Sequence, residues 1–142
     1  MDSLSITQAP CIYPTFRYAD AARMIDWLSD AFGFSPRARY MDGDKVAHAE
    51  MVFGVSLIMI GLVREDGYGR MVGGPGQGGG KSTYIAVADP DAVYATAKAA
   101  GATILEELTE RPYGSREFIC ADPEGHVWAF GTYWPKAGEP AM

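Results

Sequence analysis

Two stretches of the chain decide its fold: YPTFRYAD at residues 13–20 and STYIAVAD at residues 82–89. Each reads as a short apolar strand that ends in an Asp, and each leads into a helical segment that stops at a glycine, Gly33 or Gly101. A module of this size cannot bury a sheet face alone, so the two modules are expected to pack against one another or against a second chain. We expect function on the concave surface that they share.

The first module reads as a strand, a helix and three more strands. Its first strand is predicted over residues 11–18, and Asp20 is the expected N-cap of an amphipathic helix that Gly33 ends. The next three strands are predicted over residues 35–40, 45–53 and 55–63. The stretch 64–81 then loses all periodicity and contains eight glycines, which predicts a linker.

The second module repeats this order. Asp89 is the expected N-cap of its helix, and Pro90 occupies the first helical position, where a missing N–H costs nothing. Three further strands are predicted over residues 103–108, 116–121 and 127–134, with a tight Asp-Pro-Glu-Gly turn before the last. The sequence therefore predicts an α+β fold of two tandem βαβββ modules in one domain, residues 1–142. Module 1 is expected over about 10–63, the linker over 64–81 and module 2 over 82–134.

Composition excludes several classes of function. With 142 residues, 48% of them hydrophobic, the chain can build one domain with a real core. A net charge of −6 without a basic stripe argues against a nucleic-acid partner. Since no apolar run approaches the roughly 20 residues needed to cross a bilayer, and the start lacks a secretory signal, we expect no membrane association and a cytoplasmic location. Cys11 and Cys120 lie in apolar runs and are predicted to be buried, reduced thiols.

The stretch FICADPEGHVW at residues 118–128, together with the duplication, resembles the glyoxalase/bleomycin-resistance/extradiol-dioxygenase superfamily, also called vicinal oxygen chelate proteins. The stretches Tyr18-Ala19-Asp20 and Ala31-Phe32-Gly33-Phe34 look like the same family's first module. The resemblance covers about residues 10–134. It implies a curved, mostly antiparallel sheet around a concave cup, commonly in a homodimer.

In metal-dependent members of that superfamily the cup holds one divalent ion on four side chains. Carried over by the resemblance, the four positions are Tyr13, Ile58, Ser82 and Ala129. A divalent ion needs imidazole, thiolate or carboxylate donors, and Ile and Ala offer no lone pair. A register slip of one residue supplies no better donors, so we expect neither a metal nor another cofactor.

Strand parity predicts what lines the cup instead. Ala129 and Gly131 share one face of the last strand, and Trp128 and Phe130 share the other. If the family register holds, the small residues face the cup and the large ones pack beneath a helix. The predicted ligand-binding residues are Tyr13, Ile58, Ser82 and Ala129, with a charge from Arg116 or from Glu117, depending on parity.

Two functions from different classes follow. The first is a metal-independent protein, similar to the bleomycin-resistance branch, that binds an aromatic or cationic small molecule. The aromatic side chains that favour this reading are Tyr13, Trp27, Tyr40, Tyr68, Tyr84 and Tyr113. The alternative is an enzyme of the same superfamily, a lyase, an isomerase or dioxygenase-like. His48 and Glu50, two residues apart on one strand face, or Tyr13 would then carry protons. A plain solvent-facing strand would also give the His48 and Glu50 pattern.

Overall fold

The computed structural model describes residues 10–76 and 79–140. The chain divides into two compact units, of which the first ends at Gln77 and the second begins at Gly78, and each holds one of the predicted modules. Two residues of the predicted linker, 77 and 78, lie outside the described residues. Unit 1 contains β1 (Thr15–Tyr18), α1 (Ala21–Phe32), β2 (Ser35–Asp42), β3 (Lys45–Phe53), β4 (Ser56–Leu62) and α2 (Gly67–Val72). Unit 2 contains β5 (Thr83–Ala86), α3 (Pro90–Ala99), β6 (Thr103–Glu110), β7 (Arg116–Ala121) and β8 (Val127–Gly131).

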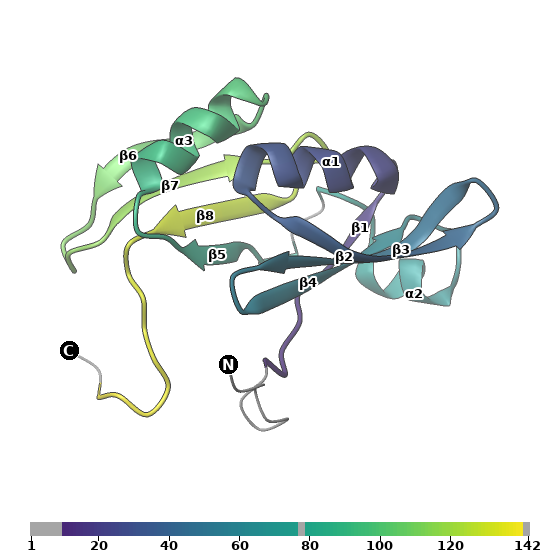
Figure 1. Cartoon of the computed structure of the whole chain (residues 1–142), viewed down its shortest axis with the longest axis horizontal. Coiled ribbons are helices and arrows are strands. Elements are labelled where there is room, and N and C mark those ends of the chain that lie inside the picture. Colours follow the sequence, from purple (N-terminus) through teal and green to yellow (C-terminus); the bar gives the residue numbers. More distant parts are fainter. Residues whose placement is uncertain (1–9, 77–78, 141–142) are drawn as a thin grey trace. The chain divides into compact units, whose positions relative to one another are not determined.

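Each unit forms one four-stranded sheet, and the two sheets have the same topology (Figure 1). The strand orders are β1-β4-β3-β2 and β5-β8-β7-β6. The first strand of each module runs parallel to the fourth, and the other neighbours are antiparallel. This arrangement confirms the α+β fold of two tandem βαβββ modules.

Helix α1 covers one face of the first sheet because its apolar residues recur on one side. The Asp20 carboxylate accepts a hydrogen bond from the Arg23 backbone N–H at 3.0 Å, and Gly33 ends the helix with a φ of 88°. Met24, Ile25 and Leu28 of the helix are fully buried, as predicted. The residues of the sheet that are buried on this side are Phe16, Tyr18, Ala49, Met51, Ile58 and Ile60.

Helix α3 covers one face of the second sheet. Asp89 caps it by accepting a hydrogen bond from the Ala92 N–H at 3.2 Å. The Tyr94 ring meets Phe118 edge-on with the centroids 5.3 Å apart, and Phe118 stacks on Phe130 at 5.3 Å. Phe130 therefore lies on the helix side of β8, as strand parity predicts for its large residues.

The turn before β8 is organised by one buried carboxylate. Asp122 is 3% exposed and accepts hydrogen bonds from the backbone N–H groups of Glu124 at 2.9 Å and His126 at 3.1 Å. Its second oxygen accepts a hydrogen bond from Nε1 of the fully buried Trp128 at 3.0 Å. The Asp-Pro-Glu-Gly motif thus joins the turn to the core beneath α3.

The first strand is shorter than predicted. It begins at Thr15 rather than Cys11, because Pro14 has no N–H to donate to a ladder, although its carbonyl accepts a hydrogen bond from Met59 N at 3.0 Å. Cys11 is consequently exposed, so the prediction that it is buried is wrong. Cys120 is buried as predicted, and burial, assisted by the charge of Asp122, raises the pKa of its thiol to about 12.

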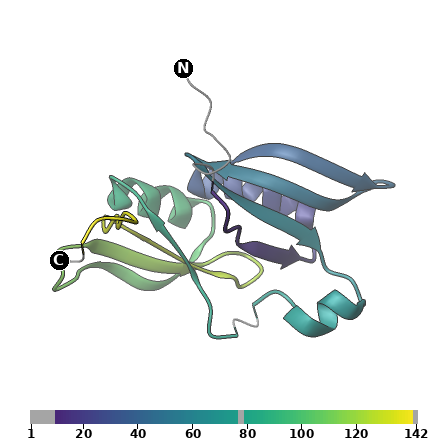
Figure 2. The same ribbon diagram turned by 90° about the horizontal axis from the view of Figure 1, so that it is seen from below.

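The predicted linker contains a helix. Asp66 caps α2 by accepting a hydrogen bond from Gly69 N at 2.7 Å, and Tyr68 of this helix lies over the guanidinium of Arg17 at 5.1 Å. The glycines within and after this helix, Gly67, Gly69 and Gly73, interrupt the hydrophobic periodicity from which a helix is predicted. Figure 2 shows it following β4 along the chain. In the described residues no helix is both long and apolar enough to span a membrane.

Candidate functional site

The candidate site lies on the face of the second sheet that is turned away from α3, here called the far face of module 2. Strand pairing defines it: Ala129 of β8 lies between Tyr84 of β5 and Ile119 of β7. Two residues further along β8, Gly131 lies opposite Glu117 of β7. On this face β8 presents only the small residues Ala129 and Gly131, because Trp128 and Phe130 point to the other side of the sheet.

Glu117 brings a buried carboxylate to the far face. The residue is 7% exposed, and its Oε1 accepts hydrogen bonds from Nε of Arg111 at 3.2 Å and from the hydroxyl of Tyr113 at 3.0 Å. Arg111 also forms an ion pair with Glu106. Hydrogen bonds to these two carboxylates raise the pKa of the Arg111 guanidinium above its usual value. The Arg111 guanidinium is therefore shared between the carboxylates of Glu106 and Glu117.

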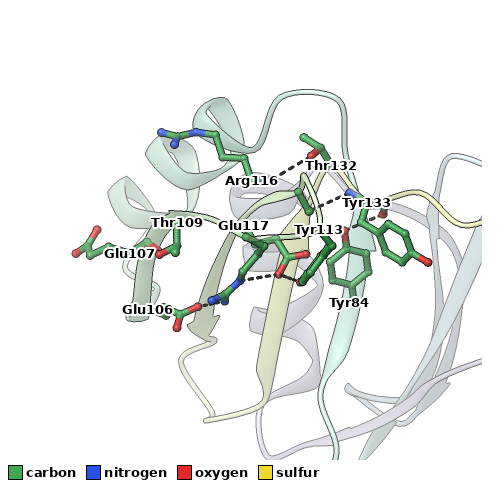
Figure 3. A network of polar contacts seen from close by, with 11 residues as sticks. Tyr84, Glu106, Glu107, Thr109, Tyr113, Arg116, Glu117, Thr132 and Tyr133 are labelled. Atoms are coloured by element: carbon green, nitrogen blue, oxygen red, sulfur yellow. Dashed lines mark hydrogen bonds and ion pairs between the residues drawn. The ribbon is translucent and has the colours of Figure 1, made fainter. Parts of the chain in front are cut away.

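Three tyrosine rings lie on one side of this carboxylate, and the hydroxyl of one of them, Tyr113, contacts it (Figure 3). Tyr84 donates a hydrogen bond from its hydroxyl to the Tyr133 carbonyl at 2.8 Å, and the rings of Tyr113 and Tyr133 meet edge-on at 5.9 Å. Tyr84, Tyr113 and Tyr133 are 38%, 61% and 52% exposed, so each of these residues keeps part of its surface in contact with solvent. Burial raises the pKa of Tyr84, and burial together with the Glu117 carboxylate raises the pKa of Tyr113. Both phenols are therefore neutral, with the proton on oxygen, at neutral pH.

Gly131 is required by the close approach of these groups. A Cβ at this position would lie 2.5 Å from Cγ of Glu117, 2.7 Å from the Tyr84 hydroxyl oxygen and 3.0 Å from Oε2 of Glu117. Any larger residue would displace the carboxylate or the phenol. The absence of a side chain at Gly131 therefore leaves room for the Tyr84 hydroxyl oxygen and Oε2 of Glu117 to approach β8.

The alternation of side chains along β7 places Glu117, and not Arg116, on the far face of module 2. Arg116 lies on the α3 side, where its guanidinium binds Asp91 with Nε at 2.7 Å from Oδ1 and Glu110 with NH1 at 3.0 Å from Oε1. Figure 3 shows Arg116 pointing toward the helix and Glu117 pointing toward Tyr113 on the other side. Of the other predicted residues of unit 2, Ala129 lies on the far face and the exposed Ser82 immediately precedes β5.

The two predicted ligand residues of unit 1 differ in their surroundings. Tyr13 precedes β1, is about one-third exposed and donates a hydrogen bond to the Pro10 carbonyl. Ile58 is buried on the α1 side of its sheet. Thr15 and Tyr84 stand five residues before their helix caps, and their partners on the fourth strands are Met59 and Ala129. Met59 is thus the counterpart of Ala129, and the alignment that selected Ile58 is one residue off.

His48 and Glu50 lie on the face of the first sheet that is turned away from α1. His48 is opposite Gly61 and Glu50 is opposite Met59. Glu50 forms an ion pair with Arg37, and the His48 ring contacts Tyr40 with the centroids 5.6 Å apart. In residues 10–76 no hydrogen bond joins His48 to Glu50. Trp27, one of the aromatic residues named from the sequence, is buried against Phe32 of its own helix.

The positions that the resemblance implies for a metal carry few donors. They are occupied by Tyr13, Met59, Ser82 and Ala129 once the register is corrected. Alanine has no lone pair, and a thioether is a soft ligand that suits few biological cations. Elsewhere in the described part of the chain no three His, Cys, Asp or Glu side chains come close enough together to hold a metal ion.

Sequence reasoning missed half of this site. Arg111 and Ser115 come from the connection between β6 and β7, and Tyr133 follows β8. Ser115 is fully buried and accepts a hydrogen bond from Tyr133 N at 3.0 Å, which fixes the chain after β8. A polar, aromatic stretch such as RPYGSRE at residues 111–117 between two strands is the one signal that pointed there.

The model of the Glyoxalase/Bleomycin resistance protein/Dioxygenase superfamily matches residues 12–130. The chain belongs to this superfamily.

Among its relatives is the uncharacterized protein Rv0887c of Mycobacterium tuberculosis (strain ATCC 25618 / H37Rv). The two chains are 31% identical over 137 residues, which is 92% of this chain and 78% of the relative. The crystal structure of TioX from Micromonospora sp. ML1 is 28% identical with a TM-score of 0.66, over 85% of this chain and 98% of that one. A glyoxalase-related enzyme from Fulvimarina pelagi shares the fold, with a TM-score of 0.68 and 19% identity over 93% and 95% of the two chains.

Proposed function

We propose that this protein binds an aromatic or cationic small molecule on the far face of module 2, without a metal ion. One observation carries the proposal: the buried carboxylate of Glu117 stands among three partly exposed tyrosines beside the small residues Ala129 and Gly131.

The chemistry of this face supports a ligand site. Small-molecule sites are mostly apolar and aromatic, with a few convergent polar groups that fix the orientation of the ligand. Neighbouring exposed aromatic rings on one face form the kind of contiguous apolar patch that marks a binding site, whereas singly exposed rings are common. Here the rings of Tyr84, Tyr113 and Tyr133 supply the area, and Glu117 supplies the polar anchor.

Independence from a metal rests on the donor set. Ala129 and Met59 cannot replace the carboxylates that a divalent ion requires at these positions. Glu117 does not restore the site, since its Oε1 already accepts hydrogen bonds from Arg111 and Tyr113. Only Oε2 of this carboxylate has no hydrogen-bond donor from residues 79–140. One such oxygen can accept a hydrogen bond from an organic ligand but cannot provide the several ligands that a metal ion needs.

A ligand-observed NMR screen tests this proposal. The purified chain is dialysed against EDTA and exposed to a library of aromatic amines and neutral aromatics, and binders are detected by saturation transfer. We expect binders in the EDTA-treated protein, and we expect Gly131→Ala to abolish their signal while Gly61→Ala retains it. Binding that requires an added divalent ion, or that survives Gly131→Ala unchanged, would contradict the proposal.

The alternative function is an enzyme in which His48 and Glu50 transfer protons. It is favoured by one observation, the presence of both side chains on the same face of the first sheet. The ion pair between Glu50 and Arg37 weighs against it, because a paired carboxylate is a poor base. Turnover of a substrate that is lost in His48→Gln and in Glu50→Gln would favour the enzyme over the binding protein.

We also propose that the protein is a homodimer that acts in the cytoplasm. The family resemblance and the acidic, soluble composition support this part of the proposal. Light scattering coupled to gel filtration measures the mass in solution, and a mass of one chain at micromolar concentration would contradict the dimer.

A further inference from the structure

We propose that the far face of module 2 selects a protonated amine: an organic ammonium with at least one N–H, carried on an aromatic or planar apolar group. The inference rests on the proposed function and names the class of ligand for the same site. Its basis is the arrangement of acceptor oxygens, charge and aromatic rings around Gly131.

Two acceptor oxygens converge beside Gly131. The position of a Cβ on this glycine is 2.7 Å from the Tyr84 hydroxyl oxygen and 3.0 Å from Oε2 of Glu117. In residues 79–140 both hydrogen bonds to the Glu117 carboxylate end on Oε1, and none ends on Oε2. The Tyr84 hydroxyl gives its proton to the Tyr133 carbonyl and its oxygen also has Ser115 as a hydrogen-bond partner, so toward a ligand it can only accept, through its remaining lone pair. A ligand that satisfies both oxygens must therefore bring hydrogen-bond donors.

The charge around these oxygens favours a cation. Arg111 is the guanidinium that contacts Glu117, and it is shared with Glu106, so the three side chains together carry one excess negative charge. A largely buried carboxylate that is only partly neutralised is costly, and a bound cation offsets this cost. Arg111 neutralises Glu117 only in part because it is shared with Glu106. A ligand ammonium bound to Oε2 would be a second positive charge beside Glu117.

The tyrosines complete a site for an ammonium group. Cations bind to the faces of aromatic rings, and carboxylates combined with several rings are typical of sites for organic ammonium ions. Tyr113 and Tyr133 meet edge-on, so the edge of one ring covers part of one face of the other, and the two residues keep 61% and 52% of their surface exposed. The same rings give an aromatic group attached to the amine a surface on which to pack.

The equivalent face of module 1 carries different groups beside its glycine. Gly61 corresponds to Gly131, and the residues beside it are His48 and Arg17, with the Arg17 side chain 3.5 Å from the position of a Gly61 Cβ. The Arg17 side chain, ion-paired with Asp66 at 3.7 Å, occupies this space in module 1, where module 2 has the Glu117 carboxylate and the Tyr84 hydroxyl. Glu50 lies two residues from His48 on this face but is ion-paired with Arg37, so two acceptor oxygens beside the glycine are a feature of module 2.

The experiment compares three probes that share one aromatic group. They are 2-phenylethylamine, which is a cation with N–H donors, its N,N,N-trimethyl derivative, which is a cation without them, and 2-phenylethanol, which is neutral. Each is titrated into the ¹⁵N-labelled full chain, and the dissociation constant is obtained from the amide shifts of Ile119, Ala129 and Gly131. The amine is expected to bind about tenfold more tightly than the alcohol, with the trimethyl compound between them.

Matched variants assign the effect to one carboxylate. Glu117→Gln removes the charge but keeps the shape, and it should reduce the preference for the amine over the alcohol to about twofold or less. Glu110→Gln makes the same change on the α3 side of the sheet, where Glu110 is paired with Arg116, and it should leave the tenfold preference intact. The amide spectrum of each variant checks that the fold is retained.

The outcomes separate this inference from the proposed function. Equal affinity for amine and alcohol at these amides would overturn the selectivity and leave a binding site for neutral aromatics. A trimethyl compound that binds as tightly as the amine would overturn the requirement for an N–H donor. If none of the three probes shifts these amides, both the inference and the proposed site are overturned.

Discussion

Replacing Gly131 with alanine adds one methyl group at the centre of the candidate site. The new carbon would lie 2.5 Å from Cγ of Glu117 and 2.7 Å from the Tyr84 hydroxyl oxygen. The first distance is about 1.0–1.5 Å shorter than the separation of about 3.5–4.0 Å at which carbon atoms attract one another. Glu117 must therefore move, and its hydrogen bonds with Arg111 and Tyr113 weaken or break.

The expected cost has two parts. Overpacking of a closely packed position costs about 1–3 kcal/mol, and alanine returns about 0.4–1 kcal/mol by restricting the unfolded chain. From the middle of these two ranges, about 2 less about 0.7, Gly131→Ala should lower the free energy of unfolding of unit 2 by about 1.3 kcal/mol. Gly61→Ala is the matched control, because its Cβ meets only the flexible Arg17 side chain at an ordinary 3.5 Å, and it should be neutral or slightly stabilising.

Urea titration followed by amide cross-peaks measures this difference in each unit separately. The peaks of Cys120 and Trp128 report unit 2, and those of Ala49 and Met51 report unit 1. Gly131→Ala should lower the unfolding midpoint at the unit 2 peaks. Equal midpoints for the two alanine variants at those peaks would refute the close approach on which the site depends.

Three further predictions concern stability. Asp122→Ala removes the acceptor of three hydrogen bonds and leaves Nε1 of the buried Trp128 without one, so unfolding in urea should show a loss of about 2–4 kcal/mol, with a smaller loss for Asp122→Asn. The hydrogen bond from Arg116 lowers the pKa of Asp91 below 3.8, so this pair contributes stability above that pH and loses it as the pH falls further; Asp91→Asn should flatten the acid limb of the stability curve. Burial raises the pKa of Tyr84 above 10.0, so its contribution is complete below pH 10 and is lost as the pH rises through the higher value; a Tyr84→Phe curve that declines as steeply as the parent's would contradict this.

The elements of the fold were predictable because local chemistry specifies them. Asp20 and Asp89 cap their helices through side-chain hydrogen bonds that depend only on the next three residues. The division of β8 into a small and a large face was also predictable, because side chains alternate along any strand. These features need no knowledge of what lies across the sheet.

The register between strands was not predictable in the same way. Gly54 begins a short turn into β4, whereas the turn before β8 is longer because the Asp122 carboxylate bonds to the backbone of residues 124 and 126. Aligning Gly54 with Gly125 therefore placed Ile58 where Met59 belongs. Turn geometry sets the register of a hairpin, and a one-residue difference moves a side chain to the other face.

The placement of the loop residues beside Glu117 was beyond sequence patterns for a related reason. Tyr113 and Tyr133 come from connections that follow β6 and β8, and only tertiary contacts bring them beside Glu117. Loop residues carry no periodicity from which a face can be inferred. The helix α2 was missed because its stabilising contacts, from Asp66 and with Arg17, occur inside a glycine-rich stretch.

A crystal structure of the EDTA-treated chain grown with 2-phenylethylamine tests the central claim most directly. The account predicts the ammonium nitrogen within hydrogen-bonding distance of Oε2 of Glu117 and of the Tyr84 hydroxyl, with the phenyl ring against Tyr113 or Tyr133. An amine that occupies another surface, or that reaches this face only through a bound divalent ion, would contradict it.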